Sequence, residues 1–437
     1  MLFLLTTLCT LTRAEVIYVD DDVVGANDGS SWIDAFTDLQ DAITVAQVGD
    51  EIRVAQGIYT PTQNAFDRDA AFELKDGVTI LGGYAGLSGM YPDFRHTEFF
   101  TTILSGDIDH NDLDIDPNSR AGNSRHVVVC MDRGDTAVLE GVTISGGYAG
   151  NARTHNYSDG RGGGLYCRGG CSPQLVDCVF SDNEAGSGAV YINGGSHPVF
   201  TRCIWQDNYA NDGGAICVNR SSYLICLNHC IFRRNVAARQ GGAIYADIMG
   251  EVRMVNCLFV ANKAGGSGGA ISCNGSNDGT GRSVFNLLNC TFYGNTFPTF
   301  DHPPTNTVTQ PDGSRVYWSD SVISNCIFYN EPSEMAVSIQ FGRSEPLIIT
   351  SIYEKELEPG HRRPIPPAHD VLFVDPYGND GILGTKDDDL RPAPGSPVID
   401  SGTNQTNPPL PAVDLDSNPR ILNGVVDIGA FEYAGPN

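Results

Sequence analysis

The chain has 437 residues and carries 27 Lys and Arg against 53 Asp and Glu, which gives a formal net charge of −26. This balance argues against nucleic acid or an anionic membrane surface as the main partner, because binding to phosphate requires a net basic face. It is compatible with an exported protein and with one that collects divalent cations. The 50 Gly and 24 Pro residues could indicate disorder, but 41% of the residues are apolar and occur in regular motifs that can build a core.

The N-terminal residues 1–14 are predicted to be a secretory signal peptide. They are mostly apolar and end in Thr12-Arg13-Ala14, which can serve as a cleavage site, although no Lys or Arg precedes the apolar run. No later stretch approaches the roughly 20 apolar residues that a membrane-spanning helix needs. We therefore expect an extracellular or cell-surface protein with no transmembrane span, and we expect it to be a monomer.

Residues 15–50 are predicted to form a short strand followed by one amphipathic helix. Apolar residues recur at helical spacing between Trp32 and Ala46, and Gly49 ends the pattern. Short β segments with Gly turns follow. We therefore expect the helix, residues 34–46, to cap the first coil of a parallel β-helix and to hide its open end from strand addition.

One motif recurs through the middle of the chain. A Cys is followed by an apolar and an aromatic residue, then by an Asn five residues after the Cys, and then by a Gly-Ala phrase. In the clearest copies these Cys residues are 25, 27 and 27 residues apart, a period typical of solenoid proteins. We therefore predict an all-β solenoid, a parallel β-helix, over residues 51–345. The Cys residues of these copies are Cys178, Cys203, Cys230 and Cys257.

The polar residue before each of these Cys residues indicates a bend between two short strands. Apolar residues three positions before and one position after the Cys do not fit strict alternation. The recurring Asn is expected in a second turn, where its side chain tolerates left-handed backbone geometry and can hydrogen-bond to the Asn of the next coil. The Gly residues let the chain turn tightly.

The repeated Cys residues, which Cys290 and Cys326 continue, are interpreted as small buried hydrophobic residues. Stacked side chains point in parallel, which is poor geometry for a disulfide even at a strand spacing of about 4.8 Å. In an oxidising compartment the local pairs that can bridge are Cys167 with Cys171 and Cys226 with Cys230. A zinc site is not expected, because no nearby His completes a ligand set.

Two Pro-rich segments, residues 297–311 and 358–369, interrupt the repeat and are predicted to project from the solenoid as loops. Beyond Asp370 the repeat is absent. Residues 346–437 are therefore predicted to form a different, C-terminal module that packs against the last coils.

The Phe-x-x-Asn motifs at residues 180–183, 232–235, 259–262 and 292–295, with Gly-Gly-Ala-Ile phrases between them, resemble the repeats of bacterial polymorphic outer membrane proteins. This resemblance implies a right-handed parallel β-helix and an exported protein, often with an adhesive role. Trp205 replaces Phe in one repeat.

The flanking motifs resemble those of secreted bacterial β-helix proteins with a choice-of-anchor C-terminal region. The biochemical role of that group is largely unassigned, so the resemblance implies fold and location rather than chemistry. The motifs are residues 29–32, 54–59, 104–107, 395–400 and 427–432.

Polysaccharide lyases and pectin-cleaving hydrolases share this fold, and the helix followed by Gly-Ile-Tyr at residues 57–59 resembles the cap of lyases that act on acidic polysaccharides. The Gly-His-Gly and Asn-Thr-Asp motifs of pectin hydrolases do not occur in the sequence, and neither does the Arg-x-Pro-x-x-Arg motif of pectate lyases. The fold alone does not settle the function.

Two acidic loops are candidate sites for Ca²⁺, the one cofactor that the sequence suggests. Oxygen ligands on an irregular loop suit a hard cation, whereas the alternative for both loops is an ordinary solvated acidic segment. The second loop brackets a Gly-rich turn within residues 375–389. The candidate ligands are Asp107, Asp109, Asn111, Asp112 and Asp114 in the first loop, and Asp380, Asp387, Asp388 and Asp389 in the second.

Residues 202–282 carry eight basic and five acidic side chains, so this part of the acidic chain is locally positive. A basic row along a solenoid would suit an acidic polysaccharide, and the alternative is an ordinary solvated coil face. A lyase would also need a base and a group that neutralises the sugar carboxylate, for which Arg233 or Arg234 with Tyr209 or His229 are candidates. The candidate substrate-binding residues are Arg202, Arg233, Arg234 and Arg253.

These observations predict a secreted or cell-surface β-helix protein with a binding or structural, adhesin-like role toward carbohydrate, a surface polymer or another cell-surface component. The alternative is a polysaccharide lyase of the pectate-lyase type that acts on an acidic polysaccharide. No nucleic-acid partner is expected.

Overall fold

The structure is a computed structural model of the chain. It describes residues 14–112, 119–131, 136–150, 160–219, 224–247, 251–266, 268–273, 284–296, 322–329, 339–340, 347–353 and 371–435. The predicted signal peptide, apart from Ala14, and both Pro-rich segments lie outside these residues, as does Asp114.

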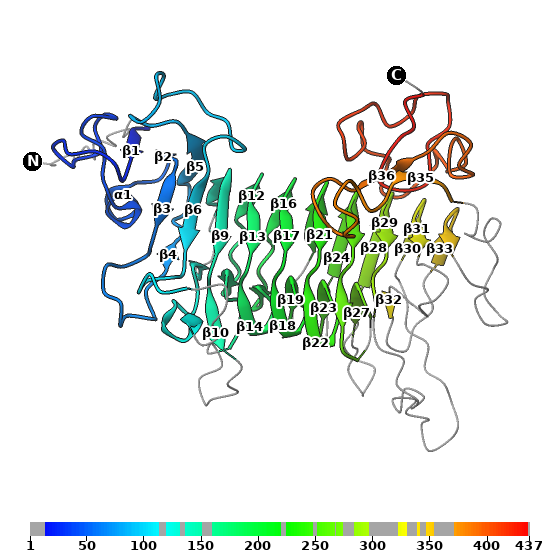
Figure 1. Ribbon diagram of the computed structural model, residues 1–437, viewed down its shortest axis with the longest axis horizontal. Helices are drawn as coiled ribbons and strands as arrows, with labels where there is room; N and C mark the ends of the chain where they lie inside the picture. Colours follow the sequence, from blue (N-terminus) through cyan, green and yellow to red (C-terminus); the bar gives the residue numbers. More distant parts are fainter. Residues whose placement is uncertain are drawn as a thin grey trace, which may run out of the picture.

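The chain winds into a right-handed parallel β-helix, as predicted, whose coils stack from one end of the molecule to the other (Figure 1). In the described part of the chain, parallel sheets run along the solenoid, and we name them sheets A to D. Sheet A has eleven strands: β1 (Val16–Val19), β2 (Glu51–Ala55), β5 (Thr79–Tyr84), β8 (Val138–Glu140), β12 (Gln174–Val176), β16 (Val199–Thr201), β20 (Ile225–Asn228), β24 (Glu251–Val255), β28 (Val284–Leu288), β30 (Val322–Ser324) and β33 (Leu347–Ile349). Sheet B has ten: β3 (Gly57–Tyr59), β6 (Thr102–Ser105), β9 (Val142–Ser145), β13 (Val179–Ser181), β17 (Ile204–Gln206), β21 (Ile231–Arg233), β25 (Leu258–Val260), β29 (Thr291–Tyr293), β31 (Ile327–Tyr329) and β34 (Ile352–Tyr353).

The two remaining sheets of the solenoid are shorter, and their strands pair in the same parallel register. Sheet C has eight strands: β4 (Phe72–Glu73), β7 (Val128–Cys130), β11 (Leu165–Cys167), β15 (Val190–Ile192), β19 (Ile216–Val218), β23 (Ile244–Ala246), β27 (Ile271–Cys273) and β32 (Ile339–Gln340). Sheet D has five: β10 (Tyr148–Gly150), β14 (Glu184–Ser187), β18 (Tyr209–Asp212), β22 (Val236–Gln240) and β26 (Lys263–Ala264). A short 3-10 helix, η1 (Ser119–Gly122), follows the first acidic loop.

Sheet B carries a stack of aromatic side chains inside the solenoid. Consecutive rings have centroids 4.5–5.2 Å apart and interplanar angles of 3–6°, and all of them are fully buried. A parallel register places equivalent residues one strand spacing apart, about 4.8 Å, which is a distance at which flat rings can stack. The stacked residues are Phe180, Trp205, Phe232, Phe259 and Phe292.

Each repeat has two corners with left-handed backbone, one on either side of its strand in sheet B. The residue before each repeated Cys has a φ between 50° and 56°, as expected for the predicted bend. At the second corner the left-handed residue is the one before the Asn, for example Asp207 (φ 56°) and Arg234 (φ 51°). The prediction placed this geometry on the Asn itself and was wrong, because the Asn side chain has to point into the interior.

The inward Asn side chains form a hydrogen-bonded ladder, which confirms the predicted pairing. The Nδ2 groups donate to the Oδ1 atom of the next Asn at distances of 3.2, 2.9, 2.9 and 2.8 Å. Each Asn also serves the backbone: Asn235 Nδ2 donates to Trp205 O at 2.9 Å. The corner therefore satisfies buried backbone groups that no strand pairing can reach. The ladder residues are Asn183, Asn208, Asn235, Asn262 and Asn295.

The Cys residues of the repeat are fully buried, as predicted, and their thiols lie near backbone carbonyl groups. Cys257 Sγ, for example, donates to Leu227 O at 3.4 Å. Cys226 and Cys230 are separate thiols, so the bridge considered for this pair is not formed. The two side chains point in different directions, because Cys230 faces the interior whereas Cys226 is partly exposed on β20.

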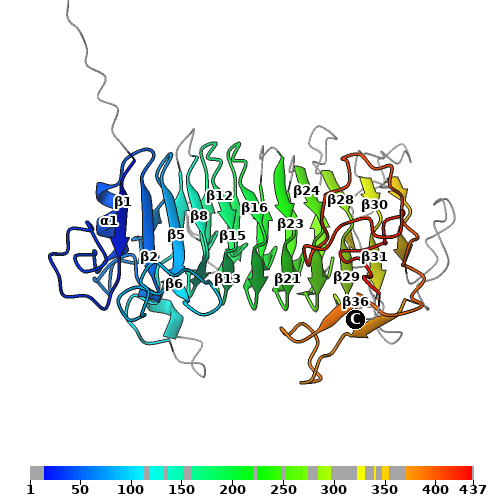
Figure 2. The same cartoon turned by 90° about the horizontal axis from the view of Figure 1, so that it is seen from above.

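The predicted helix is present but shorter than expected. Helix α1 (Leu39–Val45) begins after Asp38, whose side chain accepts a hydrogen bond from Gln40 N at 3.0 Å and caps the helix. The helix lies beside β1 at the N-terminal end of the solenoid (Figure 2), and Leu39 and Ile43 are buried in the core of the first coils. Its role in blocking strand addition stays a prediction. No helix in the described residues is long and apolar enough to cross a membrane.

Residues 371–435, which we call the C-terminal module, pack against the outer face of sheet B over the last coils. The module contains one antiparallel pair, β35 (Phe373–Asp375) and β36 (Asp389–Pro392). Leu258, Val260 and Tyr293 of sheet B share an apolar cluster with Leu390 and Phe431. Burial of this apolar surface holds the module on the solenoid. A second cluster contains Ile327, Val371, Val398 and Ile428.

Hydrogen bonds between corner Asn residues and the module backbone also fix the position of the module on the solenoid. Asn325 Nδ2 donates to Thr403 O at 3.0 Å, and its Oδ1 accepts from Thr403 N at 2.9 Å. Asn256 Nδ2 donates to Val413 O at 2.6 Å. Both Asn residues occupy the corner before a repeated Cys, where earlier coils carry Asp177 or Arg202. This corner therefore carries charged residues on earlier coils and Asn on coils that the module covers.

A buried pair of ionisable side chains lies in the module. Arg420 Nε is 3.4 Å from Glu432 Oε1, and both side chains are at most 2% exposed. Arg420 also donates to the carbonyl oxygens of Gly429 and Ala430. Burial raises the pKa of Glu432 to about 8, although the charge of Arg420 opposes the shift. The two neighbouring carbonyl contacts help to hold the guanidinium in a region from which water is excluded.

We predict that Asn235→Ala destabilises the solenoid by about 3 kcal/mol, because it leaves buried amide and carbonyl groups at one corner without partners. Chemical unfolding followed by circular dichroism measures the change. Asn193→Ala is the control, because its side chain only accepts a hydrogen bond from Gly194 N at an exposed turn. The control should change stability by less than about 0.5 kcal/mol. Equal effects of the two substitutions would contradict the ladder's role.

We predict that the stability of the module falls as the pH rises from about 4.5 to about 8. The pKa of Glu432 is raised from 4.5 to about 8 in the folded protein. The native state therefore holds this proton more tightly than the unfolded chain, and this advantage is lost as the pH rises through the folded pKa. Glu432→Gln should flatten the pH dependence of the thermal midpoint.

Asp387→Asn serves as the control for this pH experiment. A hydrogen bond from Thr385 lowers the pKa of Asp387, so that group titrates below the pH range of interest. The control should keep the wild-type slope. A wild-type midpoint that rises steadily from pH 4.5 to pH 8 would show that Glu432 does not set the pH dependence.

Candidate functional site

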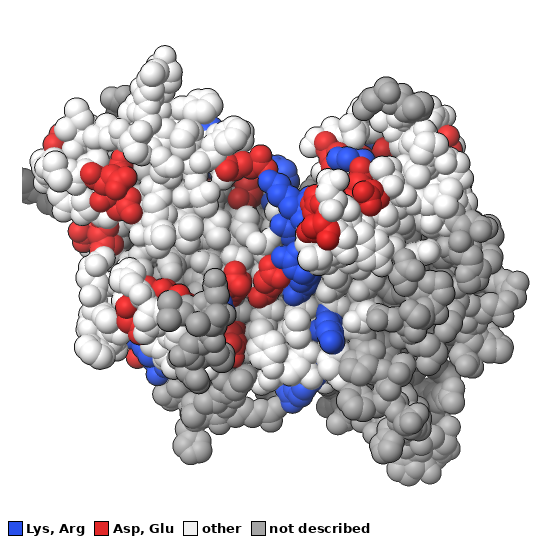
Figure 3. Space-filling view, in the orientation of Figure 1, with Lys and Arg blue, Asp and Glu red and all other residues white. Residues whose placement is uncertain are grey.

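A groove of about 320 Å³ lies between the outer face of sheet B and the C-terminal module. Its floor comes from β17, β21 and β25 and from the corner residues Arg202 and His229, and its wall comes from the module. Figure 3 shows a notch between the N-terminal end and the module, with Lys and Arg side chains along its bottom and acidic side chains beside them. The lining residues used below are Arg202, His229, Arg233, Lys386, Asp388 and Arg391.

The groove lies at the edge of the module, and the module covers the strands of sheet B whose outward-facing residues are apolar. β21 presents Ile231 and Arg233 to the outside, whereas β25 presents Leu258 and Val260, which the module covers. A strand with apolar residues on both faces is buried on both faces. This loss of alternation after β21 is the sequence signal that would have located the edge of the module.

Two of the predicted Arg residues form ion pairs with the previous coil. Arg202 holds Asp177 through two hydrogen bonds of 2.7 Å, and the partners are 25 residues apart. Arg234 holds Asp207 in the same way at 2.7 and 2.6 Å, 27 residues apart. These carboxylates raise the pKa of both Arg residues. Two of the four candidate Arg residues are therefore neutralised along the solenoid, which sequence reasoning missed because it counted charges without pairing them one period apart.

Arg233 differs from its neighbours. Its Nε and Nη2 groups donate to Gln206 Oε1 at 3.0 and 2.5 Å, so its partner in the preceding coil is a neutral amide. Burial and the adjacent Arg234 lower the pKa of Arg233, which nevertheless remains protonated at neutral pH. Among the described residues, Arg233 is the groove-floor Arg that forms no ion pair. It is half-buried on β21 and has unused N–H donors.

The remaining sugar-binding and catalytic candidates are not assembled around Arg233. Arg253 lies on β24 in sheet A, and Tyr209 lies on β18 in sheet D, so both belong to other faces of the solenoid. His229 lines the groove, but its Nε2 is 2.9 Å from Asn256 Nδ2. Burial lowers the pKa of His229, which keeps the ring neutral at pH 7. Spacing along the sequence does not reveal on which face of a coil a residue lies.

The second acidic loop forms part of the groove wall and uses its carboxylates to hold its own backbone. Asp387 Oδ2 accepts from Asn379 N at 2.6 Å and from Asp380 N at 3.2 Å. Asp388 Oδ2 accepts from Gly384 N at 2.5 Å. Asp389 pairs with Arg391 at 3.1 Å. The structure gives these carboxylates partners within the loop, and calcium binding at the second acidic loop stays a prediction.

The first acidic loop does not line the groove, and its carboxylates also have hydrogen-bonding partners. Asn111 Nδ2 donates to Asp109 Oδ2 at 2.7 Å, and Asn123 Nδ2 donates to Asp112 Oδ2 at 2.9 Å. Burial, followed by the adjacent Asp107, raises the pKa of Asp109. A cation between Asp107 and Asp109 would relieve this unfavourable pairing. Calcium binding here stays a prediction.

Among the described residues, one group of three carboxylates has ligand oxygens within 4.8 Å of one another, and it is neither predicted loop. It is formed by Asp20, Asp21 and Asp22 in the turn after β1. Asp20 Oδ2 accepts from Leu87 N at 2.7 Å, and its Oδ1 accepts from Asp22 N at 3.2 Å. The sequence prediction read this segment as a turn. The Asp20 carboxylate ties the turn to the neighbouring loop that contains Leu87.

Comparison with known proteins supports the fold and leaves the chemistry open. Residues 117–297 match the family model of the right-handed β-helix region. The crystal structure of pectate lyase Pel9A is similar with a TM-score of 0.50 and 14% identity, covering 97% of each chain. The complex of XylC with xylose gives a TM-score of 0.38 and 9% identity, covering 97% of this chain and 99% of that chain. No curated protein sequence matches the chain. At these identities the likeness concerns the fold alone.

We predict that calcium raises the thermal midpoint through the Asp107–Asp109 pair rather than through the second acidic loop. A cation that binds only the folded state stabilises that state, and the stabilisation grows with the logarithm of the cation concentration above its Kd. Melting in calcium and in chelator measures the shift. Asp109→Asn should remove it, whereas Asp387→Asn should preserve it because that carboxylate is already occupied by backbone N–H groups. An unchanged wild-type midpoint would remove both loops as calcium sites.

Proposed function

We propose that the protein is a secreted or cell-surface binding protein that holds an acidic polysaccharide in the groove. The observation that carries the proposal is Arg233, a half-buried cation on the groove floor whose partner is the neutral side chain of Gln206. A guanidinium with unused donors can bind a carboxylate through two parallel hydrogen bonds. The ligand class is therefore a chain of sugars that carry carboxylate groups.

The charges around Arg233 favour recognition of a spaced anionic chain over general attraction of anions. Arg202 and Arg234 are held by Asp177 and Asp207, so they present little net charge to a ligand. The whole protein is strongly acidic, which weakens long-range attraction of any polyanion. Binding would then depend on contact with Arg233 and on the shape of the groove.

The far side of the groove can supply flat apolar surface for sugar rings. Lys386, which lines the groove, pairs with Glu98 at 3.2 Å and so places the loop around Glu98 next to the groove. That loop exposes Phe99 (73%), and its neighbours Tyr91 (70%) and Met90 (87%) are also exposed. Exposed apolar groups that gather on one loop are typical of binding surfaces. They are suited to stack on carbohydrate.

The alternative function is a polysaccharide lyase of the pectate-lyase type. One observation supports it: Asp388 lines the groove near Arg233, and burial raises the pKa of its carboxyl. A carboxylate with a raised pKa is a better base, and the nearby Arg could neutralise the sugar carboxylate. The binding role is preferred because Asp388 Oδ2 already accepts from Gly384 N at 2.5 Å.

We predict that Arg233→Ala weakens binding to polygalacturonate, alginate or chondroitin by roughly tenfold or more, because a charged hydrogen-bonding partner is lost. Calorimetry or a glycan array measures the effect. Arg253→Ala is the matched control, since Arg253 is also a partly buried strand residue but belongs to β24 in sheet A. It should bind like the wild type. Equal loss in both variants, or wild-type preference for an uncharged glucan, would overturn the proposal.

The same polymers distinguish binding from cleavage. Incubation with each of them, with and without Ca²⁺, is followed by the absorbance of unsaturated products. The proposal expects retention without turnover. A steady rise in absorbance that is abolished in Asp388→Asn and in Arg233→Ala would establish the lyase instead.

A further inference from the structure

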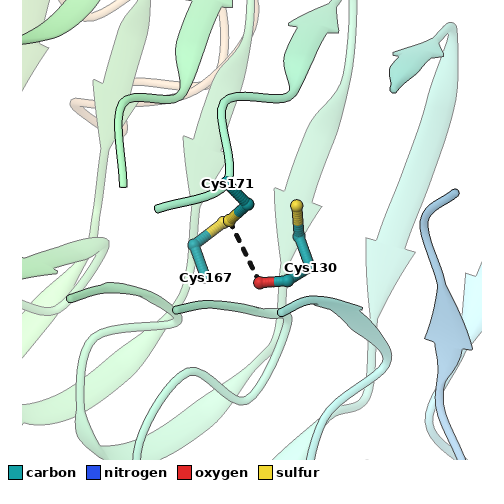
Figure 4. A group of neighbouring side chains, drawn as sticks. All are labelled: Cys130, Cys167 and Cys171. Carbon is teal, nitrogen blue, oxygen red and sulfur yellow. Dashed lines mark hydrogen bonds between the residues drawn. The ribbon is translucent and has the colours of Figure 1, made fainter. Parts of the chain in front are cut away.

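A group of three buried cysteines lies inside the solenoid, apart from the repeated Cys residues. Cys130 ends β7, Cys167 ends β11 on the next coil, and Cys171 lies in the turn before β12. All three side chains are fully buried. Figure 4 shows the side chains of Cys167 and Cys171 converging, with Cys130 beside them.

The cluster is specific to this place in the solenoid. Cys130 and Cys167 are register partners on adjacent coils, and the next partners along sheet C are the aliphatic residues Ile192 and Val218. Aliphatic side chains therefore satisfy the packing demand of this position. The third thiol, which comes from a turn, distinguishes this cluster from the single row of repeated Cys residues.

The sulfur atoms have the spacing that a thiophilic ion needs. The three Sγ atoms all lie within 4.8 Å of one another. A zinc ion with Zn–S distances of about 2.3 Å places its sulfur ligands roughly 3.8 Å apart, so small side-chain rotations are enough to close the site. In the described part of the chain, no other group of three Cys, His, Asp or Glu side chains is both this close and fully buried.

Oxygen atoms complete the surroundings of the sulfurs. Cys171 Sγ lies 3.0 Å from Cys130 O and 3.5 Å from Ser196 Oγ, which belongs to the following coil. Ser196 is itself fully buried. Three Cys ligands leave one position of a tetrahedral zinc site open, and the Ser196 hydroxyl or a water molecule would have to fill it.

We propose that Cys130, Cys167 and Cys171 form a buried site for one thiophilic d¹⁰ metal ion, Zn²⁺ or Cu⁺. Soft thiolate ligands select these ions. Each thiol that becomes a ligand releases its proton to solvent, and no electron is transferred. The ion would join two coils and the turn between sheets C and A. This inference is independent of the groove and of the proposed binding function.

The competing arrangement is a disulfide between Cys167 and Cys171, with Cys130 left as a thiol. It uses two of the three sulfurs and gives no role to the third. The two arrangements exclude each other, because a sulfur in a disulfide has no thiolate to offer a metal. The chemical state of the cluster therefore decides between them.

The test is to purify the full chain after expression with Zn²⁺ and, separately, with Cu⁺ under reducing conditions. Metal content is measured by mass spectrometry, and cysteine connectivity is measured by peptide mapping. We expect about one ion per chain in one of the two preparations. Cys171→Ser should lower this content at least about tenfold. Cys230→Ser is the matched control, because Cys230 is equally buried in the Cys row of the repeat and should leave the content unchanged.

Three results would overturn the proposal: a folded wild-type chain without metal in both preparations, a Cys167–Cys171 disulfide in the peptide map, or equal metal loss in Cys230→Ser. If Cys171→Ser does not fold, the wild-type metal content and peptide map still decide the question. Titration of the wild-type chain with Co²⁺, whose thiolate complexes absorb strongly, gives a second reading.

Discussion

The structure depends on the parallel register that places each residue directly against its equivalent on the next coil. The corners are where this register is hardest to maintain, because the chain changes direction and its backbone groups leave the strand ladders. Left-handed residues such as Asp207 and Arg234 make the turn, and the Asn after each of them restores the missing hydrogen bonds from inside. Since an amide both donates and accepts, one Asn per coil links the corners into a continuous chain.

The same register governs the charges. When one coil carries an acidic residue at a corner and the next coil carries an Arg at the same corner, the parallel register places the two side chains next to each other. Asp177 with Arg202 and Asp207 with Arg234 are examples. An isolated surface ion pair stabilises little, but here it also removes charge from the surface offered to a ligand. Arg233 stands out because the equivalent residue one coil earlier is Gln206. Specificity in such a fold can therefore arise from a missing partner as well as from an added charge.

The fold could be predicted because every periodic residue serves a position that recurs in each coil: the aromatic residue fills the interior, the Asn holds a corner, and the Cys packs beside a bend. The groove could not, because it forms where the C-terminal module meets sheet B, and the module has no period. Arg253 and Arg233 both belong to the locally basic segment of the sequence. They nevertheless lie in different sheets, A and B, because they occupy different positions within the repeat. The acidic loop at residues 375–389 could be recognised from the sequence, since its Asp387 and Asp388 carboxylates bind backbone N–H groups of the same loop.

The docking of the module shows how a uniform solenoid acquires a distinct surface. Along the corner before the repeated Cys, the residue changes from Asp177 and Arg202 to Asn256 and Asn325, and the outward residues of sheet B become apolar over the same coils. An Asn side chain offers a donor and an acceptor but no charge to desolvate, so it can be covered at low cost while fixing the position of its cover. The uncovered charged coils next to this boundary are then left open on one side and walled on the other, which is the geometry of the groove around Arg233.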